Sequence, residues 1–71
     1  MPPGTIFTHL ESGEQLWAIG SVDPARILSV KSRLEEELVR KGANFPIAVI
    51  EPVEDLDPDV IESINLRSPL S

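Results

Sequence analysis

The N-terminal part of the chain has the apolar spacing of two short strands. Residues 5–10 and 15–20 are rich in β-branched and aromatic side chains, and the polar segment Glu11-Ser12-Gly13-Glu14 between them is typical of a turn. The pattern therefore predicts a β-hairpin with a loop of about four residues. The alternation of apolar and polar side chains along the first strand is imperfect, so it does not show which face of the strand is buried. One face would carry Phe7 and His9, and the other would carry Ile6, Thr8 and Leu10.

The middle of the chain has the spacing of an amphipathic helix over residues 23–41. Its apolar positions recur every three or four residues, which is the spacing of one helix face. This stripe consists of Ile27, Val30, Leu34 and Leu38, widened by Leu28 and Val39. The opposite face is charged, and Gly42 stands where a helix C-terminus favours the left-handed backbone conformation.

Both predicted helices begin with the same phrase, an apolar residue followed by Asp and Pro. The phrase occurs as Val22-Asp23-Pro24 and again as Leu56-Asp57-Pro58. An Asp at the N-cap accepts N–H groups of the first turn, and Pro suits the first helical position because the N–H it lacks would have no partner there. The second phrase predicts a shorter helix over residues 58–65, with Ile61, Ile64 and the following Leu66 facing inward.

Between the two helices, the apolar run Phe45-Pro46-Ile47-Ala48-Val49-Ile50 predicts a strand buried on both faces. The element order predicts a small α+β domain, ββαβα: a β-hairpin, a long helix, a third strand and a short C-terminal helix. We expect the helices on one side of a three-stranded sheet, with the second and third strands parallel because a helix connects them. The single domain is expected over residues 5–66, with flexible ends at residues 1–4 and 67–71.

The third strand is predicted to lie at an edge of the sheet, although its composition is that of a central strand. An apolar edge is a site for pairing with another strand unless something covers it. We therefore expect strand 45–50 to pair with its equivalent in a second chain or with a strand of a partner protein. Tryptophan is enriched at interfaces, although in so small a domain it also serves as a core or core-rim residue. The candidate interface residues are Trp17, Phe45, Ile47 and Val49.

The size and charge of the chain narrow the classes of partner. A domain of 71 residues buries only about 60% of the surface that its unfolded chain exposes, so help from a partner chain is expected. The formal net charge is −6, which disfavours direct binding to nucleic acid or to an anionic membrane surface. The absence of cysteine removes disulfides and thiolate metal sites. We expect a cytoplasmic protein without a cofactor.

Alternating acidic residues before the second helix invite a calcium-binding interpretation. The residues are Asp55, Asp57 and Asp59. A calcium loop begun at Asp55 would, however, place Val60 where glycine is needed and Leu66 where a bidentate Glu belongs. Capping of the helix and interaction with its positive end is the favoured interpretation, so no metal site is predicted.

The single histidine, His9, has Glu11 and Glu14 nearby and could form an acid–base pair. No motif places a nucleophile beside it, and a chain of this size can hardly enclose a small-molecule pocket. We predict a strand histidine that faces solvent, no catalytic residue and no enzymatic activity.

The sequence therefore favours a non-catalytic protein–protein interaction module. It would be an accessory or structural subunit of a larger assembly, binding a protein partner or forming a dimer through strand 45–50. The alternative is an acidic inhibitor, such as an antitoxin or a viral protein that imitates nucleic acid, which would bind a basic protein surface. The charge of −6 and the acidic segment 51–59 favour this second hypothesis.

Overall fold

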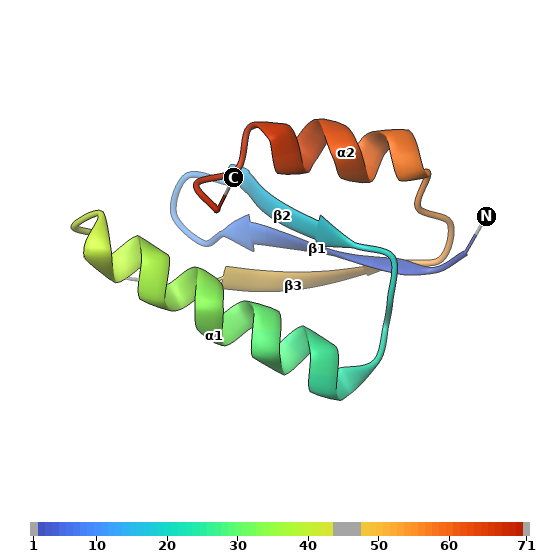
Figure 1. The fold of residues 1–71 in the computed structure, drawn as a ribbon, viewed down its shortest axis with the longest axis horizontal. Coiled ribbons are helices and arrows are strands. Elements are labelled where there is room, and N and C mark those ends of the chain that lie inside the picture. Colours follow the sequence, from blue (N-terminus) through green and yellow to red (C-terminus); the bar gives the residue numbers. More distant parts are fainter. Residues whose placement is uncertain (1, 44–47, 71) are drawn as a thin grey trace.

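The computed structural model describes residues 2–43 and 48–70 of the chain and contains a small sheet with two helices (Figure 1). The elements follow in the order β1 (Gly4–His9), β2 (Gln15–Ile19), α1 (Pro24–Arg40), β3 (Ala48–Val53) and α2 (Pro58–Leu66). This confirms the predicted α+β class and the order ββαβα. The third strand was predicted over residues 45–50, of which 45–47 lie outside the described residues; the described strand runs from Ala48 to Val53, beyond the predicted end at residue 50.

The sheet has the strand order β2-β1-β3, and β1 pairs with both neighbours in antiparallel orientation. Strands β2 and β3 therefore run in the same direction, as predicted, with β1 between them. Phe7 of β1 lies opposite Trp17 of β2 and Ile50 of β3, and the register of β1 with β2 shifts between Phe7 and Thr8. The order leaves β3 at one edge of the sheet, as expected, and β2 at the other.

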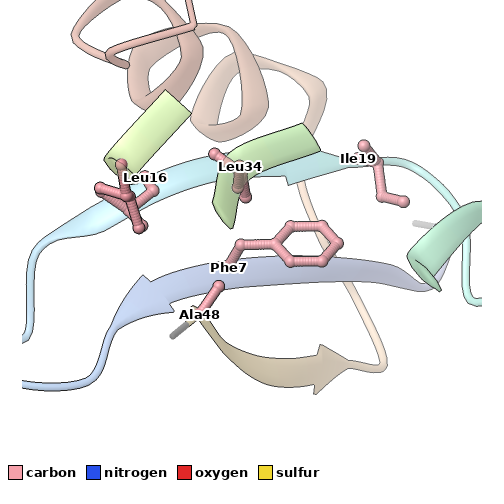
Figure 2. Packing of buried hydrophobic residues seen from close by; sticks show 6 residues of the cluster. Phe7, Leu16, Ile19, Leu34 and Ala48 are labelled. Carbon is pink, nitrogen blue, oxygen red and sulfur yellow. The ribbon is translucent and has the colours of Figure 1, made fainter. Parts of the chain in front are cut away.

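Each face of the sheet holds its own core cluster and is packed against one helix. Because successive side chains of a strand point to opposite faces, Phe7 and Ile6 belong to different faces. The Phe7 face, covered by α1, holds one core cluster, which contains Phe7, Leu16, Ile19, Leu34, Leu38 and Ala48 (Figure 2). The Ile6 face, covered by α2, holds the other, which contains Ile6, Ala18, Leu56 and Ile64.

The prediction that both helices lie on one side of the sheet was therefore wrong. Figure 1 shows α1 and α2 on either side of the strands. The physical reason is that β1 has apolar side chains on both faces, and a single helix covers only one of them. The same arrangement explains the imperfect alternation of the first strand, since neither of its faces is left to solvent.

Helix α1 is bounded by the caps that the sequence predicts. The Asp23 carboxylate accepts the N–H of Ala25 at 3.2 Å. At the other end Gly42 has a φ of +83°, and the N–H of Ala43 reaches the carbonyl of Leu38 at 2.9 Å. With the bond from the Gly42 N–H to the carbonyl of Val39 at 3.0 Å, this forms a Schellman motif, which ends the helix.

The buried stripe of α1 is narrower than predicted. Leu34 and Leu38 are buried, and Ile27 and Val30 are partly buried against the same cluster. The two residues predicted to widen the stripe, Leu28 and Val39, are 65% and 58% exposed. They therefore belong to the outer surface of α1 and not to its core-facing side.

Helix α2 begins at the second Asp-Pro phrase. The Asp57 carboxylate accepts the N–H of Asp59 at 2.8 Å, and the preceding residue, Leu56, is buried against the Ile6 face.

After α2, residues 67–70 fold back over the domain. Ser68 is buried, and Leu70 packs against the Phe7-face cluster.

Candidate protein-interaction edge

The outer edge of β3 is the part of the predicted interface that the structure describes. Only Ala48 of this strand is buried, whereas Val49 and Ile50 are 37% and 36% exposed. The prediction of a strand buried on both faces was therefore wrong for the described residues. On the Ile6 face, α2 packs mainly against β2, and Val49 and Glu51 of β3 are exposed; on the Phe7 face, Ile50 is exposed as well.

The register shows which backbone groups of β3 point outward. Ala18 of β2 has both its N–H and its C=O bonded to the side chain of Asn65, so these groups point away from β1. Ile6, opposite Ala18, must then direct its own N–H and C=O toward β3, where it lies opposite Glu51. Since the direction alternates along a strand, the N–H and C=O of Ile50 point away from β1, which is the orientation that pairing with a further strand requires.

Pro52 has the same outward orientation as Ile50. Its partner in β1 is Thr5, the neighbour of Ile6, so a proline at this position removes no hydrogen bond from the β1–β3 ladder. It does remove one donor from the outer edge. The free edge therefore offers an N–H and C=O at Ile50 but only a C=O at Pro52, which limits the length of strand that can pair there.

Polar side chains hold β3 in place on the Ile6 face. Thr8 donates its hydroxyl hydrogen to Glu51 Oε1 at 2.6 Å. Val49, opposite Thr8, lies on this same face, whereas Ile50 lies on the Phe7 face beside Phe7. An incoming strand would thus meet one exposed apolar side chain on each face of the sheet.

The opposite edge of the sheet is closed. Asn65 of α2 accepts the N–H of Ala18 at 2.8 Å and donates to the C=O of Ala18 at 3.0 Å. The Asn65 carboxamide thus occupies both backbone groups of Ala18, which a strand pairing at this position of β2 would use. Sequence reasoning missed this role, because nothing local to Asn65, between Ile64 and Leu66, indicates a partner 47 residues away.

The four predicted interface residues are not brought together within the part of the chain that the structure describes. Phe45 and Ile47 lie outside the described residues. Trp17 lies on β2, partly buried at the rim of the Phe7-face cluster, whereas Val49 lies on β3 and on the Ile6 face. Trp17 and Val49 thus lie at opposite edges of the sheet and on opposite faces of it, so they belong to different surfaces.

His9 stabilises the hairpin turn. Its Nδ1 atom accepts the N–H groups of Glu11 and Ser12, each at 3.3 Å. Gly13, with a φ of +72°, completes the turn by donating to the carbonyl of His9 at 3.0 Å. The imidazole is therefore engaged with its own loop.

Asp57 caps α2 and Asp59 lies in its first turn, as the favoured interpretation predicts for these two residues. Across residues 2–43 and 48–70, no group of three or more His, Cys, Asp or Glu side chains is placed to hold a metal ion. One hollow among these residues, of about 480 Å³, is an open depression on the outer side of α1. It is lined by Ser32, Glu35, Glu36, Val39 and Arg40.

The charges are unevenly distributed along the chain. Residues 42–66, which include β3 and α2, contain no Lys or Arg, whereas most of the basic residues lie on α1 and its C-cap. The acidic residues of this segment are Glu51, Glu54, Asp55, Asp57, Asp59 and Glu62. The β3 edge is therefore bordered by negative charge.

Comparison with family models, with curated proteins and with solved structures found no match to this chain. Neither of the described helices is both long enough and apolar enough to cross a membrane.

Proposed function

We propose that this chain is a non-catalytic protein–protein interaction module that binds an extended strand along the outer edge of β3. The observation that carries the proposal is the outward orientation of the N–H and C=O of Ile50 on an edge strand with two exposed apolar side chains. Addition of a strand to such an edge uses backbone hydrogen bonds for affinity and alternate side chains for specificity. The partner is a strand of another protein or β3 of a second copy, which would form a dimer.

A single substitution can remove the outward donor while keeping the fold. Ile50→Pro deletes an N–H that points away from β1, in the same orientation that Pro52 already has. Ile50→Thr is the matched control, because it keeps the N–H and a β-branched side chain. We expect the wild type and Ile50→Thr to associate and Ile50→Pro to lose association, while all three keep the same circular dichroism spectrum.

The first measurement uses the chain itself as the probe. Light scattering gives the mass over micromolar to millimolar concentrations, and amide hydrogen exchange reports whether Ile50 becomes protected as the concentration rises. If the wild type keeps the mass of one chain, the partner is a different protein, and capture from the native cell is compared between wild type and Ile50→Pro. Equal association or equal capture by these two variants would contradict the proposal.

The absence of catalysis is part of this proposal, and two observations support it. The Nδ1 atom of His9 is engaged by two turn amides, and the hollow of about 480 Å³ lies open on the surface of α1. Catalysis requires an acid or base held within reach of a bound substrate, usually in an enclosed pocket. If the protein has an enzymatic activity and the His9→Ala variant loses it, this part of the proposal is contradicted.

A second candidate function rests on the charge distribution. The segment from residue 42 to residue 66 carries six acidic and no basic residues, as expected of an inhibitor that covers a basic protein surface. The two functions differ in their response to salt. An electrostatic complex loses affinity steeply as the ionic strength rises, whereas a complex formed by strand pairing and apolar contacts persists.

A further inference from the structure

The two edges of the sheet differ in how their backbone groups are satisfied. On β2, the N–H and C=O of Ala18 are both bonded to the Asn65 side chain, and Ala18 itself is buried. On β3, the outward groups of Ile50 belong to a residue that is 36% exposed. The asymmetry arises from α2, which lies along β2 and brings Asn65 to its edge (Figure 1).

We infer that Asn65 is an autoinhibitory lock on the β2 edge, which restricts the domain to one strand partner at a time. An amide side chain that accepts from the N–H and donates to the C=O of one residue reproduces the bonds that a neighbouring strand would make. A strand can add to β2 only after Asn65 has been displaced.

The lock has a direct consequence for assembly. Strands β2 and β3 lie at opposite edges, so a domain with both edges open would pair the β2 edge of one copy with the β3 edge of the next. Such a contact is head-to-tail and does not close, so it extends into a continuous sheet. With β2 locked, assembly stops at a dimer or at a one-to-one complex. The strand that Asn65 keeps from the β2 edge is therefore β3 of a second copy of this chain.

Amide hydrogen exchange in the wild type tests the lock without any change of sequence. We expect the Ala18 amide to exchange far more slowly than the Ile50 amide at low protein concentration. In Asn65→Ala the Ala18 amide should lose this protection, while the amide of Trp17, which faces β1, keeps its own. Equal exchange of the Ala18 and Ile50 amides in the wild type would overturn the inference, even if the variant fails to fold.

Light scattering then tests the consequence for assembly. We expect the mass of the wild type to reach a plateau and the mass of Asn65→Ala to rise continuously with concentration. Ser63→Ala, which changes an exposed residue of the same helix, is the control and should behave as the wild type. A folded Asn65→Ala with the wild-type mass at every concentration would overturn the inference.

The inference rests on the proposed function in one respect, namely that β3 is the edge open to pairing. A double variant separates the test of the Asn65 lock from the test of pairing at β3. In Asn65→Ala/Ile50→Pro, continuous growth should return to a plateau, because only β2 remains open. If Ile50→Pro has no effect in either background while Asn65→Ala still increases the mass, the β3 proposal fails and the lock stands. If Ile50→Pro abolishes association of the wild type and Asn65→Ala changes nothing, the lock fails and the β3 proposal stands.

Discussion

Gly4 of β1 lies directly against Leu56, the residue that precedes the N-cap of α2. A Cβ atom added at Gly4 would stand 2.5 Å from Leu56 Cδ2 and 2.7 Å from the carbonyl oxygen of Ile19. The Leu56 N–H also donates to the carbonyl of Pro2 at 3.1 Å. The start of β1 and the start of α2 are thus joined at a position that has no room for a side chain.

Gly4→Ala is therefore expected to lower the free energy of unfolding by about 2 kcal/mol, as overpacking of a filled site does. Gly20→Ala is the matched control, because its added Cβ would meet only Ile61 Cδ1, at an ordinary distance of 3.7 Å. That variant should be unchanged or more stable by about 0.5 kcal/mol. Urea unfolding followed by circular dichroism makes the comparison. Equal stability of the two variants would show that Leu56 moves aside freely.

The narrow stripe of α1 predicts a large difference between two leucines of the same helix. Leu34 has no exposed surface and packs in the Phe7-face cluster (Figure 2), whereas Leu28, on the outer surface of α1, is 65% exposed. Leu34→Ala should cost about 3 kcal/mol because it leaves a cavity in the core. Leu28→Ala should stay within about 0.5 kcal/mol of the wild type. Fluorescence of Trp17 during urea unfolding measures both, and a similar loss at the two positions would contradict this packing.

The N-cap of α2 predicts a loss that depends on the side-chain oxygen of Asp57. Asp57→Ala removes the acceptor for the Asp59 N–H and should lower stability by about 1 kcal/mol. Asp57→Asn keeps an acceptor oxygen and should retain most of this stability. Thermal unfolding of the three proteins measures the effect. If Asn is as damaging as Ala, the charge of Asp57 matters more than its hydrogen bond.

The packing of Leu70 after α2 predicts that this residue contributes to the stability of the domain. This residue is partly buried against the Phe7-face cluster, and the carbonyl of the preceding Pro69 accepts from Lys41 Nζ at 3.3 Å. Leu70→Ala should lower the free energy of unfolding by about 1 kcal/mol through lost apolar burial. Urea unfolding measures the change, with Leu66→Ala as the control because Leu66 is 71% exposed. A loss no larger for Leu70 than for Leu66 would indicate that the end of the chain leaves the domain in solution.

The candidate site could be predicted only in part. The sequence indicated an edge strand that includes Val49, because the short connections allow no order that places it in the centre of the sheet. It also grouped Trp17 with Val49 as candidate interface residues, whereas the register places them at opposite edges and on opposite faces of the sheet. The grouping failed because a list of apolar residues carries no information on which edge and which face each one occupies.

The sequence by itself determined the order of the elements and the ends of the helices. Asp23 and Asp57 cap their helices, and Gly42 takes the left-handed conformation, because each of these features depends on residues a few positions away. The tertiary structure decided which face each helix covers and which edge stays open. Ile6 and Phe7 are neighbours in the chain but form separate cores, and Asn65 reaches Ala18 only because α2 packs along β2. These relations depend on contacts between distant segments, which local propensities do not specify.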